Sequence, residues 1–225
     1  MRKHTKFESE NSGRLLVPSS LPFDFHVRRP LSGAPRELIL LLHGFAESGK
    51  RILDKLEPLL PADAVVLAPN GPFPLPHKTD TGYVMTHSWY LYDPMAREYF
   101  IDMRLALEFL TAGIAQLKYE GLPKRIVGFS QGGYLAPFVA QTLSDVRQVV
   151  GIACEFLDEE LTGALPARMD AVHGTADDVV AVADAKKSHA ALVGRGVTGR
   201  FIEVEGAGHR IDGRMRNEVK ELLLR

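Results

Sequence analysis

Short apolar runs separated by segments of helical periodicity occur along most of the chain. The runs at 38–42 and 64–68 are continuously apolar, which is typical of strands buried on both faces of a parallel sheet. Further strands are predicted at 15–17, 23–27, 125–129, 149–153, 169–173 and 201–204. The pattern therefore predicts about eight strands in all.

Segments with apolar residues at helical spacing lie between these runs. The clearest is 101–119, where apolar side chains recur every three or four residues and form one stripe, which we interpret as a core-facing surface. Other helices are predicted at 52–60, 134–143, 184–193 and 214–224. Because helices alternate with strands and crossovers are right-handed, the chain is expected to have an α/β fold, with a mostly parallel central sheet flanked by helices on both faces.

The segment 73–99 departs from this alternation. It is rich in proline and aromatic residues and shows no clear period. Irregular segments of this length in a compact domain are usually functional or mobile, so we predict a loop that covers the substrate. It is too short to form a large helical cap domain, and the site beneath it is expected to be fairly open.

Composition narrows the class of protein. The 225 residues carry a formal net charge of -1 without a basic stripe, which argues against nucleic acid or an anionic membrane as partner. We expect a polar, flexible extension at 1–14 and a single domain at 15–225. No apolar run is long enough to cross a bilayer, so no stable membrane insertion is expected. The only cysteine, Cys154, excludes an intrachain disulfide, and a cytoplasmic location is predicted.

The predicted strand at 125–129 leads into a Gly-x-Ser-x-Gly motif centred on Ser130, and a helix follows. This is the setting of a nucleophile elbow, in which the serine occupies a sharp turn. Gly128 and Gly132 are needed there because side chains would collide with the neighbouring strand and helix. Pro137 argues against a regular helix after the motif, since it would kink or shorten the helix interior.

A serine nucleophile needs a general base, and the base needs a group that orients it. Catalysts in parallel sheets gather where strands end, and Asp177 and His209 each follow a predicted strand. The order Ser130, Asp177, His209 is the nucleophile, acid, base order of α/β-hydrolases. The adjacent Asp178 competes with Asp177 for the role of the acid.

The remaining histidines are given structural interpretations. His173 precedes a glycine at a strand end and is interpreted as a packed, hydrogen-bonded residue. Others are expected to be solvated or in loops, and their spacing assembles no metal site: His4, His26, His77, His87 and His189.

An acyl-transfer intermediate needs two N–H donors aimed at its oxyanion. The backbone N–H of Gln131, directly after the serine, is one candidate. The second is the backbone N–H of Phe45, in the loop that follows the strand at 38–42. Alternatively, Gly44 only permits a tight exit from that strand.

Together these motifs resemble, in order, those of the carboxylesterase, lysophospholipase and acyl-protein thioesterase family of α/β-hydrolases, over about 15–225. The segments that carry the resemblance are Leu42-His43-Gly44-Phe45, Ala68-Pro69-Asn70, Ser88-Trp89-Tyr90, Gly128-Phe129-Ser130-Gln131-Gly132-Gly133, His173-Gly174-Thr175-Ala176-Asp177 and Gly208-His209-Arg210-Ile211. The chain departs from the family pattern at Pro137, at 154–157, at Asp178 and at Ala181.

The resemblance implies a triad of Ser130, Asp177 and His209 with oxyanion donors at Phe45 and Gln131. It also implies that no cofactor is used and that the protein is a monomer or a weak homodimer.

The substrate site is predicted from the same family resemblance and from the aromatic residues of the segment 73–99. The resemblance places Trp89 near the acyl pocket. Apolar residues that line a shallow groove for the acyl chain are expected to be Phe73, Leu75, Met85, Trp89, Tyr90 and Tyr92. Alternatively, the loop packs its own aromatic residues onto the sheet.

These observations predict a serine hydrolase of small-molecule carboxylic esters, with short to medium acyl chains, or of thioesters. It would act through an acyl-enzyme. One alternative is lysophospholipase or acyl-protein thioesterase activity on long acyl chains. A non-catalytic binding protein on a hydrolase fold is a remote second alternative, because fold does not fix function.

Overall fold

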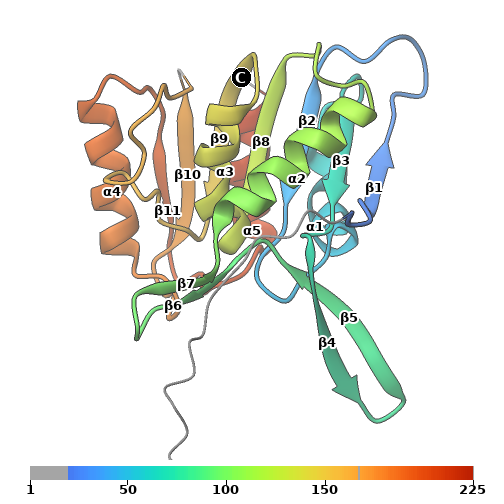
Figure 1. Ribbon diagram of the computed structural model, residues 1–225. Coiled ribbons are helices and arrows are strands. Elements are labelled where there is room, and N and C mark those ends of the chain that lie inside the picture. Colours follow the sequence, from blue (N-terminus) through green and yellow to red (C-terminus); the bar gives the residue numbers. More distant parts are fainter. Residues whose placement is uncertain (1–19, 167, 225) are drawn as a thin grey trace, which may run out of the picture.

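The computed structural model describes residues 20–166 and 168–224, and this part of the chain forms a central sheet of seven strands (Figure 1). The strands are β1 (Phe25–Arg28), β2 (Leu38–Leu42), β3 (Val65–Pro69), β8 (Lys124–Phe129), β9 (Val146–Ile152), β10 (Met169–Gly174) and β11 (Phe201–Val204). Their order is β1-β3-β2-β8-β9-β10-β11, and only β1 is antiparallel to its neighbour. The predicted α/β fold is confirmed. The strand expected at 15–17 lies outside the described residues.

Five α-helices cover the two faces of the sheet in the described part of the chain. They are α1 (Gly49–Leu56), α2 (Met103–Gln116), α3 (Gln131–Thr142), α4 (Val182–Gly194) and α5 (Gly213–Leu223), with a short 3₁₀ helix at Glu57–Leu59. Buried residues of α2, α3 and α4 pack in one hydrophobic cluster, and those of α1 and α5 pack in a second. The predicted covering of both faces is therefore correct.

Strand β2 shows why its sequence is continuously apolar. Leu38, Leu40 and Leu42 belong to the cluster with α2, α3 and α4, whereas Ile39 and Leu41 belong to the cluster with α1 and α5. All five side chains are completely buried. A central strand that packs against helices on both faces has no position for a polar side chain.

The segment 73–99 is not irregular, and that prediction was wrong. It forms a hairpin of β4 (Phe73–Thr79) and β5 (Gly82–Ser88) and most of a second hairpin of β6 (Leu91–Asp93) and β7 (Glu98–Ile101). Pro74 and Pro76 occupy alternate positions of β4, so the N–H groups they lack point to the outer edge of the hairpin and cost no ladder hydrogen bond. Because prolines are uncommon in strands, the sequence pattern of this segment did not indicate a strand.

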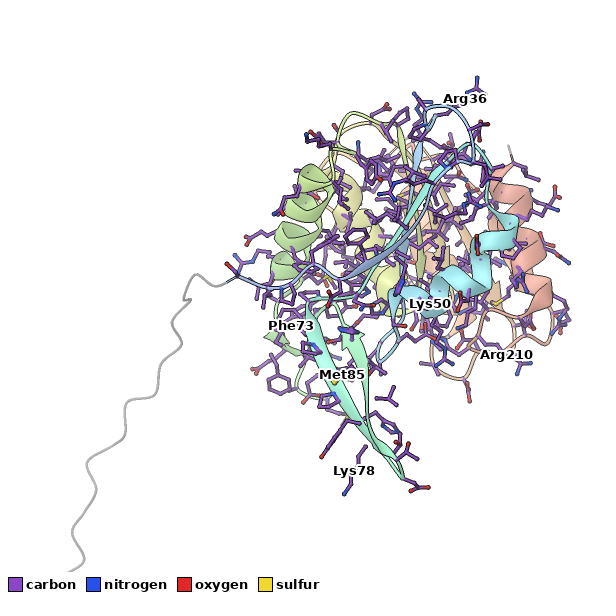
Figure 2. All side chains as sticks on the ribbon, turned by 90° about the vertical axis from the view of Figure 1, so that its right-hand side faces the viewer. Arg36, Lys50, Phe73, Lys78, Met85 and Arg210 are labelled. Carbon is purple, nitrogen blue, oxygen red and sulfur yellow. The ribbon has the colours of Figure 1, made fainter. Side chains whose placement is uncertain are left out.

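The β4–β5 hairpin projects from the body of the molecule (Figure 1), and Lys78 lies near its tip (Figure 2). Its root is at the end of the sheet where β3 ends, the same end that carries the candidate site described below. Side chains along the outer half are exposed, including Tyr83, Val84 and Met85. In the described residues, no helix is both long and apolar enough to span a membrane.

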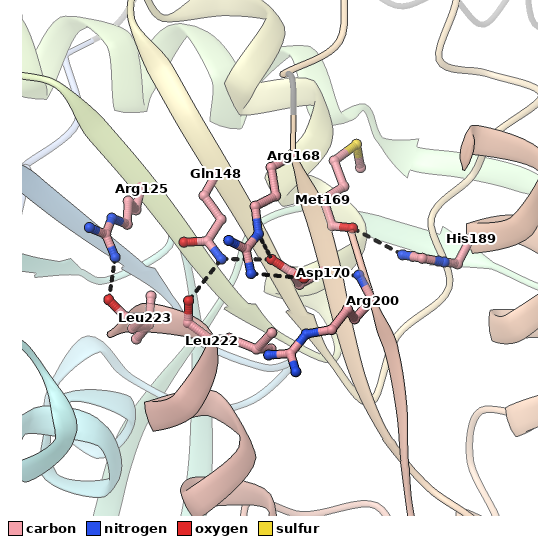
Figure 3. A network of polar contacts seen from close by, with 9 residues as sticks. All are labelled: Arg125, Gln148, Arg168, Met169, Asp170, His189, Arg200, Leu222 and Leu223. Carbon is pink, nitrogen blue, oxygen red and sulfur yellow. Dashed lines mark hydrogen bonds and ion pairs between the residues drawn. The ribbon is translucent and has the colours of Figure 1, made fainter. Parts of the chain in front are cut away.

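The opposite end of the sheet holds a polar network that fixes α5 (Figure 3). The fully buried Asp170 accepts hydrogen bonds from Arg168 Nε and Gln148 Nε2, both at 2.6 Å, and from the Arg200 N–H at 2.9 Å. Gln148 Nε2 also donates to the Leu222 carbonyl at the last turn of α5, at 3.3 Å. A carboxylate can be buried at this position because these donors satisfy its charge.

His189 also lies elsewhere than expected. It was predicted to be solvated or in a loop, yet it is buried on α4, and its Nε2 lies 3.0 Å from the Met169 carbonyl oxygen (Figure 3). A backbone partner on β10 satisfies the imidazole and allows it to enter the core.

Candidate active site

Ser130 lies in the sharp turn between β8 and α3. Its backbone angles, φ 49° and ψ −120°, lie outside the regions that non-glycine residues normally adopt. A Cβ atom on Gly128 would lie 2.2 Å from the Gly132 carbonyl oxygen, and one on Gly132 would lie 2.2 Å from the Leu42 carbonyl oxygen. The turn therefore requires both glycines, for the reason predicted from sequence.

Helix α3 begins at Gln131, directly after the serine, and not at 134 as expected. Pro137 is buried inside this helix, which nevertheless continues to Thr142. The expected shortening of the helix therefore does not occur.

The side chains of Ser130, His209 and Asp177 form one chain of hydrogen bonds. Ser130 Oγ lies 2.9 Å from His209 Nε2. His209 Nδ1 lies 2.8 Å from Asp177 Oδ2 and 3.1 Å from Oδ1. To donate to an ionised carboxylate, Nδ1 must carry the proton, which leaves Nε2 free to accept the serine proton. This geometry is suited to activating a hydroxyl as a nucleophile.

The Asp177 carboxylate is held in a fixed orientation by the backbone. Its side chain is completely buried, and Oδ1 accepts the N–H groups of Val179 and Val180, both at 2.9 Å. Burial acts to raise the pKa of this carboxyl, but the hydrogen bonds from Val180, His209 and Val179 outweigh it, and the pKa is lowered. Asp177 is therefore ionised at neutral pH.

The two neighbouring candidates have other positions. Asp178 is exposed, and the carboxylate that contacts His209 is that of Asp177. His173 is buried, and its Nε2 lies 2.9 Å from the Val180 carbonyl oxygen and 3.3 Å from Asp177 Oδ2. It is packed and hydrogen-bonded, as interpreted from sequence, and it supports the loop that carries Asp177.

Both predicted oxyanion donors lie in segments that lead away from the sheet next to Ser130. Gln131 is the first residue of α3, so its backbone N–H has no partner within the helix. Phe45 lies in the loop between β2 and α1, and β2 pairs directly with β8, the strand that leads to Ser130. The Phe45 side chain is 53% exposed, so its ring lies at the surface beside this loop.

The predictions from sequence did not include the role of the His43 side chain. This residue is completely buried directly after β2. Its Nδ1 lies 2.7 Å from the Gly44 carbonyl oxygen, and its Nε2 accepts the Gly71 N–H at 2.9 Å. Burial lowers the pKa of His43 to about 4, although the Gly44 hydrogen bond acts in the opposite direction. The imidazole is thus neutral, and it ties the loop after β2 to the loop after β3.

A second set of hydrogen bonds joins the segment 89–90 to His43, at the start of the loop after β2, and to the side chain of Gln131. Trp89 Nε1 donates to the His43 carbonyl at 2.9 Å. The Gln131 side chain accepts the Trp89 backbone N–H at 3.0 Å and donates to the Tyr90 carbonyl at 2.9 Å. The sequence contains one signal for this structural role of Gln131, which is an amide side chain directly after the nucleophile. Such a group is buried only when its oxygen and its nitrogen both have hydrogen-bond partners.

The residues predicted to bind substrate lie at different depths. Trp89 is completely buried and Tyr90 is 7% exposed, and both belong to the hydrophobic core. Phe73 is half-buried at the root of the β4–β5 hairpin. Trp89 and Tyr90 therefore support the loops around Ser130 from inside, and a direct contact with substrate stays a prediction.

Comparisons with known proteins identify the family and the fold of this chain. A family model described as phospholipase/carboxylesterase matches residues 29–224. No curated protein sequence matches significantly. Among solved structures, esterase PE8 is similar with a TM-score of 0.74 at 23% identity, over 90% of this chain and 98% of that chain.

Two plant proteins are also similar. Acyl-protein thioesterase 2 of Zea mays has a TM-score of 0.68 at 21% identity, over 89% of this chain and 97% of that chain. SOBER1 of Arabidopsis thaliana has a TM-score of 0.65 at 23% identity, over 84% of this chain and 98% of that chain. At these identities the structural similarity demonstrates a shared fold.

Proposed function

Because the chain belongs to the phospholipase/carboxylesterase family of α/β-hydrolases, we propose that it is a serine hydrolase that cleaves carboxylic esters or thioesters through an acyl-enzyme. The observation that carries this proposal is the hydrogen-bonded chain from Ser130 Oγ through His209 to Asp177. Ser130 is the proposed nucleophile, His209 the general base and Asp177 the group that orients His209.

In the first half of the reaction, Ser130 Oγ attacks the acyl carbonyl carbon while its proton passes to His209 Nε2. The imidazolium that forms is stabilised by the Asp177 carboxylate, 2.8 Å from Nδ1. The oxyanion receives hydrogen bonds from the backbone N–H groups of Phe45 and Gln131, a contribution of about 3 kcal/mol for each such donor. Collapse of the intermediate breaks the bond to the alcohol or thiol, which takes the proton from His209.

In the second half, water replaces the leaving group. His209 accepts a proton from the water as it attacks the acyl-enzyme carbonyl, the same donors stabilise the second oxyanion, and the acid is released as Ser130 recovers its proton. No step requires a cofactor, because the three side chains and two backbone N–H groups account for every proton and charge.

We expect short to medium acyl chains to be preferred. This preference is supported by the burial of Trp89 and Tyr90, which leaves little of these two large side chains exposed to extend a groove for a long acyl chain. The exposed Tyr83, Val84 and Met85 on the β4–β5 hairpin favour the alternative of long acyl chains. A series of aryl esters of increasing acyl length discriminates between the two preferences. A steep fall in kcat/KM beyond short chains would exclude a preference for long acyl chains.

The proposed function is tested with Ser130→Ala on an aryl acetate. Turnover should fall by at least about 10⁴-fold, with the thermal unfolding midpoint nearly unchanged, because the change removes only one hydroxyl oxygen. Ser32→Ala, at an exposed turn residue, is the matched control and should match the parent protein. Activity retained by a folded Ser130→Ala protein would refute the assignment.

A further inference from the structure

The loop between β2 and α1, residues 43–48, carries a strained backbone and one of the proposed oxyanion donors. Ala46 adopts φ 54°, in the left-handed region, which costs a non-glycine residue roughly 1–3 kcal/mol. The turn is closed by the Glu47 N–H, which donates to the Gly44 carbonyl at 3.2 Å. A strained loop of this kind keeps its shape only if surrounding groups fix it.

The side chain of Glu47 folds back onto this loop. It is only 11% exposed, and Oε2 accepts the backbone N–H of Gly44 at 3.3 Å. Oε1 lies 3.0 Å from Lys55 Nζ and 3.1 Å from Arg51 Nε. Two cations of α1 therefore hold the carboxylate in place, and its other oxygen holds the N–H of Gly44, the residue before Phe45.

The backbone of Glu47 is held as well. Its carbonyl accepts the N–H of His87, near the root of the β4–β5 hairpin, at 2.8 Å. The Gly44 peptide is also close to the elbow, since a Cβ atom on Gly44 would lie 3.0 Å from the Phe129 ring. Glu47 thus joins the loop, helix α1 and the hairpin directly beside the residue that precedes Ser130.

We propose that Glu47 is a positioning residue that aims the Phe45 N–H at the oxyanion by fixing the Gly44 peptide. The inference rests on the proposed function and adds to it a group that does not touch substrate. Its carboxylate contacts the backbone one residue before the donor, so a change in its acceptor atom alters the direction of that donor. A misdirected Phe45 N–H weakens the hydrogen bond to the oxyanion of the transition state more than any contact with the bound substrate. The value of kcat should therefore change more than KM.

Two substitutions of similar size separate this role from a general contribution to stability. Glu47→Met fills the same space without an acceptor, whereas Glu47→Gln keeps an oxygen that can accept the Gly44 N–H. Both lose the ion pairs with Lys55 and Arg51, so the difference between them isolates the acceptor. Asp54→Ala, which removes an exposed carboxylate of α1 paired with Lys50, is the control for charge on the same helix.

For hydrolysis of an aryl acetate, Glu47→Met should lower kcat by about 10- to 100-fold, with KM within threefold of the parent value. Its rate of inactivation by a fluorophosphonate, whose phosphoryl oxygen takes the place of the oxyanion, should fall in parallel. Glu47→Gln should stay within fivefold of the parent protein, although it loses both ion pairs just as Glu47→Met does. Asp54→Ala should be within twofold.

The proposal is overturned if the Met and Gln variants lose equal activity, if Glu47→Met stays within twofold of the parent protein, or if it does not fold. Each of these results would mean that Glu47 contributes only to the stability of the fold or has no role in the reaction. Failure of the proposed function has a different signature, because Ser130→Ala would then retain turnover regardless of Glu47.

Discussion

Replacing Asp177 with Asn tests the proton arrangement of the site without removing any heavy atom. The Val179 and Val180 N–H groups, both 2.9 Å from Oδ1, require an oxygen at that position. The asparagine oxygen therefore takes this place, and the NH₂ group faces His209 Nδ1, where the carboxylate oxygen was 2.8 Å away. His209 must then accept at Nδ1 and carry its proton on Nε2.

In that tautomer Nε2 donates toward Ser130 Oγ and cannot take the serine proton. A tautomer change of this kind lowers kcat by about 10⁴-fold in a Ser-His-Asp triad, which corresponds to about 5 kcal/mol in the barrier. The loss should appear in kcat for aryl acetate hydrolysis at pH 7.5. The unfolding midpoint should change little, because both backbone hydrogen bonds to the side chain are kept.

Asp178→Asn is the matched control, since it makes the same chemical change at the adjacent, exposed carboxylate. It should leave kcat within twofold of the parent value. A loss of less than tenfold in Asp177→Asn, or a larger loss in Asp178→Asn, would refute the assignment of Asp177 as the group that orients His209.

Two further predictions concern stability. The pKa of His43 is lowered to about 4 in the folded protein, mainly by burial. The unfolded chain binds the proton first as the pH falls from 6.5, so His43 should cost about 3 kcal/mol of unfolding free energy by pH 4. Urea titrations should show this loss in the parent protein and not in His43→Gln; an equal pH dependence of the two would contradict it. Asp170→Ala leaves Arg168 and Gln148 without their partner and should cost about 3–5 kcal/mol, with kcat retained, whereas a cost below about 1 kcal/mol would show that the network is dispensable.

The features that the sequence predicts well are encoded locally. Strand β2 is apolar at every position because both of its faces are buried, and α2 shows one stripe because only one face is buried. Asp177 and His209 can be chosen from the sequence because both follow predicted strands, and parallel strands end at the same edge of the sheet.

The features that it does not predict depend on partners far along the chain. The hydrogen bonds of His43 and Gln131 join residues 28 to 46 positions apart, and neither residue type by itself reveals such a partner. The hairpin of β4 and β5 escaped detection because prolines stand at positions whose N–H groups would point outward. His189 and Asp170 are polar residues in the core, and only their backbone and side-chain partners explain their burial.

The central claim, that Ser130 is activated by His209, is tested most directly by covalent labelling. The purified protein is incubated with a fluorophosphonate probe, digested and analysed by peptide mass, with Ser130→Ala and His209→Ala treated in parallel. We expect one adduct, on Ser130, that is absent in the first variant and strongly reduced in the second. A folded parent protein that takes no label, or an adduct on another residue that persists in Ser130→Ala, would contradict it.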